Sequence, residues 1–301
     1  MKSTLAQPHS HLLMTCVGAE TISHHGAALA KPVPAQPLRG ARAALACAAC
    51  AMPVLLGFVL PAAILAQLAL GDPEARWGAR LAGLVGNSFT IAGVTAIAAV
   101  ALAVAMAYAA RLSKSRLAAA ANRFAALGYA MPGAVVAIGV LVPLGRLDNW
   151  LAGLLEEATG AKAGLLFTGT IAALVYACLV RFLAVALQTT EAGLARITPS
   201  MEDAARSLGA SPAAALARVH APLLAPSLAT AALLVFVDVM KELPATFALR
   251  PFDFDTLAVE AYHLAKDERL AEAAVPSLVI VAVGLVPLLA LSRRYFQATR
   301  S

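Results

Sequence analysis

Long runs of apolar residues, separated by short polar segments, make up most of the chain after its first forty residues. The runs are continuous, whereas the strands of a membrane β-barrel would alternate apolar and polar residues. A helix needs about 20 apolar residues to cross the hydrocarbon core of a bilayer. The pattern therefore predicts an all-α membrane protein with six transmembrane helices, over Ala43–Leu70, Phe89–Ala110, Phe124–Leu144, Leu165–Leu187, Ala221–Met240 and Ala273–Leu291.

The composition supports this membrane setting and gives an orientation. Apolar residues make up 60% of the 301 residues and charged residues only 13%, whereas soluble domains carry about a quarter charged residues. If the N-terminus is inside, most of the 23 Lys and Arg residues fall in the predicted inner segments and most acidic residues fall outside. The positive-inside rule therefore predicts that both termini are cytoplasmic.

The two ends of the chain and its cysteines need separate interpretations. Residues 1–40 are polar and small, and they predict a disordered cytoplasmic tail. The membrane domain then covers residues 41–295, and residues 296–301 form the cytoplasmic C-terminus. Cys47 and Cys50 have redox spacing but lie in Ala-rich membrane sequence, so we interpret them, like Cys178, as small core residues.

A polar segment with a distinctive pattern separates the fourth and fifth predicted spans. Ser200 is a candidate N-cap for a helix over Ser200–Leu208, whose acidic first turn would complement the helix dipole. Gly209 would end this helix, and Ser211-Pro212 would begin a second one. The pattern predicts a rigid elbow on the cytoplasmic side, with a face of small residues that another protein can approach closely.

This elbow resembles, position by position, a loop of the permeases in ATP-binding-cassette (ABC) importers. The family pattern is Glu-Ala-Ala, three residues, Gly, nine residues, then Ile-x-Leu-Pro. The spacing is kept here, with Asp for Glu, Val for Ile and Ala for Leu. In that family the loop receives the ATPase subunit. The resemblance implies a type I importer permease with an ATPase-coupling loop that contains Asp203, Ala204, Ala205, Gly209, Val219 and Pro222.

Other stretches resemble one branch of the superfamily, the ferric-iron importer permeases. They are Lys-Glu-Leu-Pro-Ala-Thr at 241–246, and the stretches 249–252, 254–259, 180–187 and 128–133. The resemblance covers roughly residues 41–295 and implies import of ferric iron across a bacterial inner membrane. Members of that branch usually carry two six-span halves, and this sequence resembles the second half.

The resemblance also implies partners. They are two ABC ATPase subunits, a periplasmic substrate-binding protein and a second permease half, in a homodimer or a heterodimer. No nucleic acid and no cofactor is expected. We also predict that the chain cannot transport alone, since six spans with one coupling loop would engage only one ATPase.

The segment from Lys241 to Glu272, hereafter the outer segment, is long, charged and predicted to lie outside the membrane. Its oxygen and nitrogen donors would suit Fe(III). A charged outer segment is more often a solvated or partner-binding surface, however, and in such importers the binding protein holds the cargo. We therefore predict no metal site, and a surface facing the binding protein that includes Asp253, Asp255, Glu260, Tyr262 and His263.

Two ionisable side chains within the predicted spans have simple structural interpretations. Arg181 lies six residues before the inner end of the fourth span and could extend to the cytoplasmic interface or to a carbonyl end of a helix. Asp238 is predicted to pair with Lys241 at i, i+3, and a direct pair between Arg181 and Asp238 is not expected. This arrangement does not resemble a proton relay.

Known catalytic signatures are missing from the sequence. It has no Gly-x-x-x-x-Gly-Lys-Ser/Thr phosphate loop and no Gly-x-Ser-x-Gly or His-Glu-x-x-His motif. We therefore predict a transport subunit that is not an enzyme, with ATP hydrolysed by a separate chain. Two alternatives stay open: the same architecture with another cargo, such as thiamine, sulfate or a polyamine, and a six-span secondary transporter or channel without an ATPase.

Overall fold

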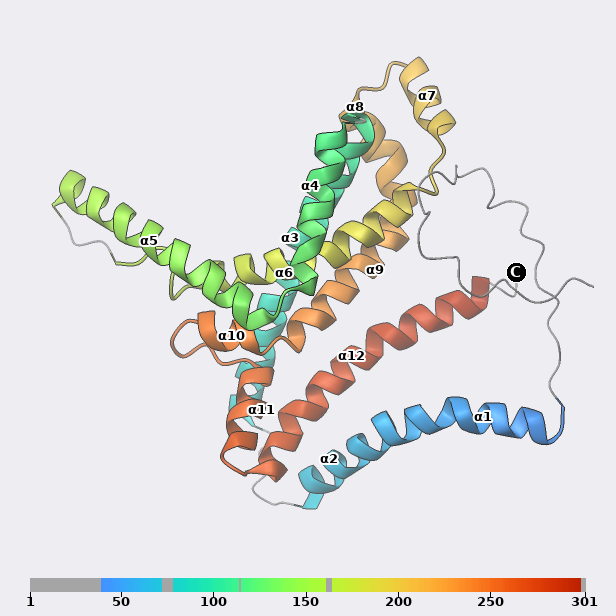
Figure 1. Ribbon diagram of the computed structural model, residues 1–301, viewed down its shortest axis with the longest axis vertical. Helices are drawn as coiled ribbons and strands as arrows, with labels where there is room; N and C mark the ends of the chain where they lie inside the picture. Colours follow the sequence, from blue (N-terminus) through green and yellow to red (C-terminus); the bar gives the residue numbers. More distant parts are fainter. Residues whose placement is uncertain (1–38, 72–77, 114, 161–163, 299–301) are drawn as a thin grey trace, which may run out of the picture. The chain divides into compact units, whose positions relative to one another are not determined.

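The computed structural model describes residues 39–71, 78–113, 115–160 and 164–298, and every regular element among them is a helix (Figure 1). The chain divides into two units, residues 1–54 and 55–301. In the first unit, helix α1 spans Ala41–Val54 and has no buried side chain. The predicted tail over residues 1–40 lies outside the described residues except for its last two.

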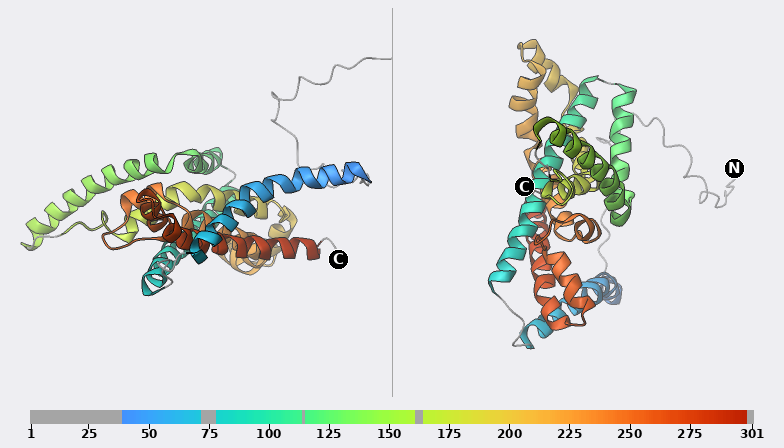
Figure 2. Two further views of the ribbon diagram at one scale, coloured as in Figure 1. Left: turned by 90° about the horizontal axis from the view of Figure 1, so that it is seen from below. Right: turned by 90° about the vertical axis from the view of Figure 1, so that its left-hand side faces the viewer.

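The second unit contains the remaining helices. In chain order they are the π-helix η1 (Leu55–Val59), α2 (Leu60–Gly71), α3 (Ala79–Ser113), α4 (Arg116–Ala126), the 3₁₀-helix η2 (Leu127–Ala130), α5 (Gly133–Thr159), α6 (Ile171–Leu194), α7 (Pro199–Ser207), α8 (Pro212–Ala215), the π-helix η3 (Leu216–His220), α9 (Ala221–Met240), α10 (Pro244–Leu249), α11 (Leu257–Lys266) and α12 (Leu270–Ala298). Figure 2 shows the same elements from two further directions.

Within the described part of the chain, 5 helical runs are long and apolar enough to cross a membrane. They are Ala41–Gly71, Ala79–Ser113, Gly133–Thr159, Ile171–Leu194 and Pro212–Met240. The sixth predicted span falls on α12, whose apolar part, Leu270–Val286, is shorter. The all-α membrane fold is therefore confirmed, and the count of six spans stays a prediction.

The predicted third span begins in the wrong place. Phe124–Leu144 is not continuous, because α4 ends at Ala126 and α5 begins only at Gly133. Between them Met131 is extended, with φ −81° and ψ 137°, since a residue that precedes proline is disfavoured in helical geometry. The break also brings η2 against α6: a Cβ on Gly128 would overlap the Val180 carbonyl oxygen.

The predicted fourth span also begins too early, because an apolar loop precedes α6. The first helical residue is Ile171, with Thr170 as its N-cap. The loop is held by Asp148 of α5, whose carboxylate is fully buried. That carboxylate accepts hydrogen bonds from the backbone N–H groups of Leu166, Phe167 and Thr168, at 2.6–3.1 Å, and from the Thr168 hydroxyl. In a helix these backbone N–H groups would donate to backbone carbonyl oxygens. Here they donate to the carboxylate of one side chain instead.

We expect Asp148→Asn to lower the free energy of unfolding by about 1–3 kcal/mol, because the amide offers one acceptor oxygen where the carboxylate offers two to the backbone N–H groups of the loop. Thermal unfolding in detergent and protease cleavage between residues 164 and 170 would measure this. Asn149→Ala is the matched control, since Asn149 is exposed on the same helix and its side chain bonds only to the Gly145 carbonyl. Equal stability of Asp148→Asn and the parent would contradict the prediction.

The core forms where α3, α6 and α9 pack together. The buried face of α3 is built from small side chains at spacings of three and four residues, Ala92, Ala96, Ala99, Ala103 and Ala107. Small residues at these spacings let helix backbones approach closely, as is common between membrane helices. Cys178 of α6 belongs to this core, as predicted, whereas Cys47 and Cys50 of α1 are exposed, so the core prediction is wrong for them.

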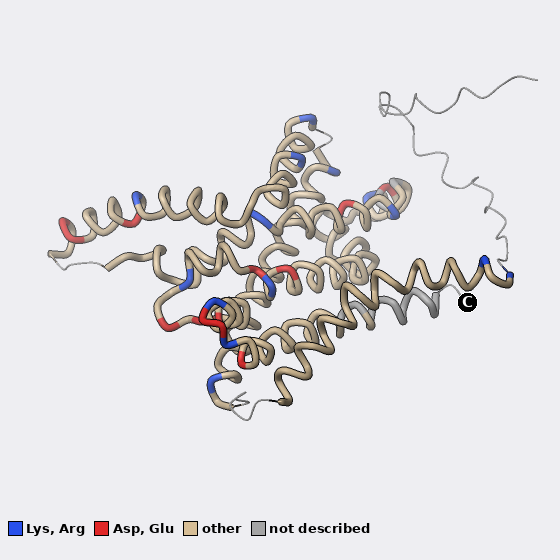
Figure 3. Tube along the Cα trace, turned by 60° about the horizontal axis from the view of Figure 1, so that its bottom comes forward, with Lys and Arg blue, Asp and Glu red and all other residues tan. Residues whose placement is uncertain are grey.

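Charged residues gather at helix ends and connections, and long helical stretches carry none (Figure 3). This distribution is expected for helices that lie in lipid, where an unpaired charge is costly. A second, smaller apolar cluster joins Ala69 of α2 to Ala274 and Val275 of α12. Most of the candidate functional residues lie in two polar segments, one before α9 and one after it.

Candidate functional site

The predicted coupling loop, residues 198–222, forms an elbow of short helices. α7 is followed by a turn in which Gly209 has φ +81°, and the Gly209 N–H donates to the Arg206 carbonyl at 2.9 Å. α8 then begins with Ser211 as its N-cap and Pro212 in its first turn. The predicted turn and second helix are therefore confirmed.

One detail of the first helix was predicted wrongly. The N-cap of α7 is Thr198 rather than Ser200, and α7 starts at Pro199. The hydroxyls of Thr198 and Ser200 lie 2.9 Å apart and bond to each other, and the Thr198 side chain makes no cap hydrogen bond. Pro199 at the first helical position favours the start of α7 there instead. Proline has no backbone N–H, and an N–H at this position would have no partner within the helix.

Three of the predicted coupling residues surround a shallow hollow of about 460 Å³ between α7 and η3. Ala205, Gly209 and Val219 line it, together with Leu208, Ala210, Ser211, Ala214 and Arg218. Asp203 and Ala204 are exposed on α7, and Pro222 is exposed at the start of α9, outside the hollow. Leu208, one of the lining residues, is 88% exposed. The elbow thus presents a concave, mostly apolar surface.

Side chains of α3 hold the chain before α7 and after the Gly209 turn, and sequence analysis missed them. Arg111 donates to the Leu194 and Ile197 carbonyls before α7, at 2.6 and 2.8 Å. Tyr108 donates to the Pro212 carbonyl after the Gly209 turn, at 2.9 Å. The Tyr108 ring also packs against His220, a fully buried residue whose Nδ1 lies 3.1 Å from the Ala215 carbonyl oxygen.

The outer segment is more ordered than a solvated loop. α10 and α11 occupy most of it, and its predicted surface residues have separate environments. Asp253 is exposed with φ +61°, whereas Asp255 pairs with Arg250 at 2.5 Å. The rings of Tyr262 and His263 each pack edge-on against Phe247.

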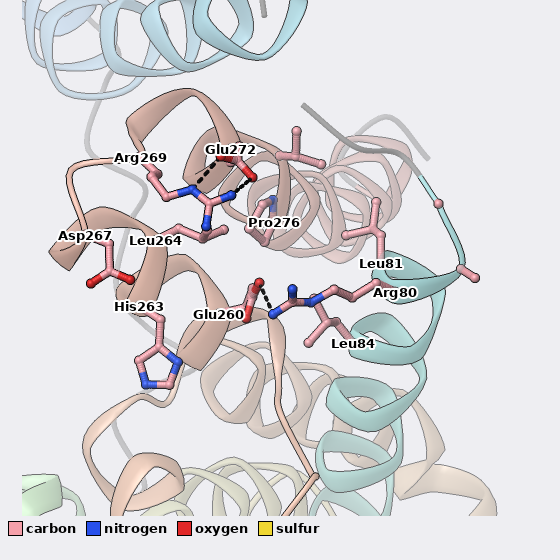
Figure 4. Close-up of a pocket in the computed structure, with 13 residues that line it drawn as sticks. Arg80, Leu81, Leu84, Glu260, His263, Leu264, Asp267, Arg269, Glu272 and Pro276 are labelled. Carbon is pink, nitrogen blue, oxygen red and sulfur yellow. Dashed lines mark hydrogen bonds and ion pairs between the residues drawn. The ribbon is translucent and has the colours of Figure 1, made fainter. Parts of the chain in front are cut away.

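Glu260 is buried and pairs with Arg80 of α3 at 2.7 Å. Figure 4 shows this pair beside a cavity of about 610 Å³, which is also lined by His263, Asp267, Arg269 and Glu272. Among the described residues, no three His, Cys, Asp or Glu side chains lie close enough together to hold a metal ion. The donors of the outer segment are thus spread over ion pairs and ring contacts.

A further ion pair has a buried carboxylate, with the Glu242 side chain 5% exposed and the Arg181 side chain 23% exposed. Arg181 pairs with Glu242 at 2.5 Å, and Glu242 also accepts a hydrogen bond from the Ala245 N–H at 3.1 Å. The prediction that Arg181 reaches the cytoplasmic interface is wrong, because α6 continues to Leu194 and leaves Arg181 near its middle. A Cβ on Gly133 would overlap both side chains, so α5 starts directly against the pair.

The second predicted ion pair is confirmed. Lys241 Nζ lies 2.9 Å from Asp238 Oδ1 at the end of α9. This hydrogen bond raises the pKa of Lys241, and the negative charge of Asp238 acts in the same direction, while partial burial opposes both. Lys241 is 61% exposed, so the pair is screened by solvent. Arg181 does not pair with Asp238, as expected, and its partner Glu242 was not predicted from the sequence.

Residues 99–298, which include the coupling loop and the outer segment, match the family described as binding-protein-dependent transport system inner membrane component. The chain belongs to this family. The predicted resemblance to importer permeases is therefore confirmed, and the alternative of a secondary transporter or channel without an ATPase is not supported.

Two permeases are similar in sequence. The Fe(3+)-transport system permease protein FbpB 2 of Haemophilus influenzae is 28% identical over 211 residues, which are 70% of this chain and 38% of that protein. The putative 2-aminoethylphosphonate transport system permease protein PhnV of Salmonella typhimurium is 31% identical over 167 residues, 56% of this chain and 57% of that protein. The matched region thus spans well under two thirds of either relative.

Two solved structures share the fold of this permease. A bacterial ABC transporter involved in the import of the acidic polysaccharide alginate aligns with a TM-score of 0.64 and 16% identity, over 84% of this chain and 95% of that chain. The alginate transporter in complex with an alginate pentasaccharide-bound periplasmic protein gives a TM-score of 0.61 and 14% identity, over 84% and 93% of the two chains. At this identity the likeness shows the fold alone.

Proposed function

We propose that this permease is the membrane subunit of an ATP-driven importer that moves ferric iron from the periplasm to the cytoplasm. The family match over residues 99–298 carries the importer part of the proposal. The iron part rests on the similarity to FbpB 2 over 70% of the chain. The stretches at 241–246, 249–252 and 254–259, which resemble iron importers, lie within the outer segment.

A phosphonate is the second candidate substrate. The sequence identity to this chain is 31% for PhnV and 28% for FbpB 2. The PhnV match covers a shorter part of the chain. The two substrates differ chemically, since ferric iron is a hard cation and 2-aminoethylphosphonate is a small zwitterion with a phosphonate group. The paired side chains around Glu260 include both acidic and basic groups, so their charge does not favour either substrate.

The coupling loop is proposed to bind an ABC ATPase on the cytoplasmic side, and both termini are proposed to lie on that side. The hollow lined by Ala205, Gly209 and Val219, with exposed Leu208 beside it, offers an apolar surface for this contact. ATP hydrolysis belongs to that separate chain. The outer segment is proposed to face a periplasmic binding protein, through residues around Asp253 and Tyr262.

Because the chain carries one coupling loop, the working complex is proposed to contain two ATPases and two permease halves, as a homodimer or a heterodimer. Purification of the chain in mild detergent should therefore recover an ATPase. Native mass measurement should show two copies of this chain, or this chain and a second permease. A stable, active complex with a single six-span chain would overturn the assembly.

The substrate can be identified by uptake assays in a strain that lacks the permease. We expect expression of the chain with its ATPase to restore accumulation of radiolabelled ferric iron. Excess unlabelled 2-aminoethylphosphonate should not reduce that accumulation. Restored uptake of the phosphonate without restored uptake of iron would assign the second candidate instead.

A further inference from the structure

Helix α3 makes polar contacts with both loops of the proposed function. One end lies beside α11 in the outer segment and the other beside α8 in the coupling loop, as the right-hand view of Figure 2 shows. α3 is 35 residues long. Ser88 and Tyr108, which bond to the two loops, are separated by about 30 Å at 1.5 Å per residue, which is about the thickness of the hydrocarbon core.

At the cytoplasmic end, one turn of α3 holds the coupling loop at two points. Tyr108 and Arg111 are neighbours at i, i+3 on the helix surface. Arg111 bonds to the chain just before α7, and Tyr108 bonds to the chain just after the Gly209 turn. Residues 198–211 contain the predicted coupling helix. The chain on either side of them is thus hydrogen-bonded to side chains of one turn of α3.

At the opposite end, α3 holds the outer segment where α11 begins. Asn87 donates to the Asp255 carbonyl at 2.9 Å, and Ser88 accepts from the Leu257 N–H at 2.9 Å. Ser88 and Leu257 are both buried, so this contact is protected from water. About two turns further along α3, Arg80 pairs with Glu260 of α11.

α9 also joins the two loops, but it is less regular than α3. It follows directly on the π-helix η3 and contains Pro226, which removes a backbone hydrogen bond. α3 is a continuous α-helix without proline. A displacement at one end of α3 is therefore carried to the other end with less bending.

We propose that α3 transmits movement between the outer segment and the coupling loop, with Tyr108 and Arg111 as positioning residues at one end and Asn87 and Ser88 at the other. This inference rests on the proposed function, because it requires an ATPase at one loop and a binding protein at the other. The transmitted quantity is a coupling free energy: occupancy of one loop changes the response at the other.

The test measures ATP hydrolysis by the purified, reconstituted complex, with and without its periplasmic binding protein, purified with its natural cargo. Tyr108→Phe/Arg111→Gln and Asn87→Ala/Ser88→Ala each remove side-chain contacts at one end. We expect each double variant to keep the copurified ATPase and to lose about fivefold of the stimulation by the binding protein. Thr90→Ala is the matched control on α3, because the exposed Thr90 hydroxyl bonds only to the Gly86 carbonyl within the helix.

The combined variant separates transmission from local damage. If both ends act through α3, all four substitutions together should lose about the same fivefold, whereas two independent lesions would multiply to about 25-fold. The inference would be overturned if either double variant kept a stimulation of ATP hydrolysis within twofold of the parent. It would also be overturned if the combined variant showed the product of the two losses. A parent chain that recovers no ATPase would instead refute the proposed function.

Discussion

Replacement of Gly209 by valine is expected to abolish transport while the amount of permease in the membrane stays within about twofold of the parent. Gly209 has φ +81°, a backbone conformation that a β-branched residue adopts only with strain of about 1–3 kcal/mol. A Cβ there would have no neighbouring atom within 4 Å, so the cost lies in the backbone rather than in a clash within the chain.

The consequence for transport follows from the position of the turn. Gly209 sets the angle between α7 and α8 and lines the hollow at the elbow. Relief of the strain would rotate α7, which carries Asp203, Ala204 and Ala205, away from its place beside η3. A valine side chain would in addition project toward the surface proposed to receive the ATPase.

Gly209→Asn is the matched control, because asparagine tolerates positive φ far better than valine does. We expect the asparagine variant to keep most of the uptake and the valine variant to lose it, together with the copurified ATPase. Uptake of radiolabelled substrate, normalised to permease in the membrane, measures both. Equal normalised uptake by the valine variant and the parent would refute the role of the turn.

The second large effect is expected at the buried ion pair. Glu242→Ala should destabilise the permease by about 3–5 kcal/mol, because it leaves the Arg181 guanidinium without its partner in the helix bundle. The Ala245 N–H, which is buried, would also lose its acceptor. Lower abundance in the membrane and a lower midpoint of thermal unfolding in detergent would report the loss.

Two further variants make this test specific. Arg181→Met/Glu242→Leu removes both charges and should recover much of the stability that Glu242→Ala loses, since an apolar replacement of a buried pair is often neutral. Asp238→Asn breaks the more exposed pair with Lys241 and should cost less than about 1 kcal/mol. A Glu242→Ala variant as stable as the parent would show that the buried pair does not hold the helices together.

Features that depend on near neighbours in the chain could be predicted from the sequence. The fifth span was placed at the limits of α9, Ala221–Met240, because its apolar run is bounded by polar residues at both ends. The Gly209 turn, the start of α8 at Ser211-Pro212 and the Asp238–Lys241 pair follow from residues at most four positions apart. The break at Met131-Pro132 had a local signal of the same kind, which the apolar run concealed.

Features that depend on which helices pack together could not be predicted in this way. Apolar Leu165–Phe167 looked like the start of a span, but Asp148, on the preceding helix, satisfies its backbone as a loop. Arg181 finds its partner 61 residues away, where the turn after α9 meets the middle of α6.

The same division holds for the candidate site. Sequence alone determined the membrane fold, the elbow and, through its spacing, the resemblance to importer permeases, because periodicity, turn residues and spacing are properties of the chain itself. Only the tertiary structure placed Tyr108 against Pro212, 104 residues away, and Asn87 against Asp255, 168 residues away. A side-chain donor bonds to whichever carbonyl the packing of α3, α6 and α9 brings within 3 Å, and that packing is set by the fit of many small side chains at once.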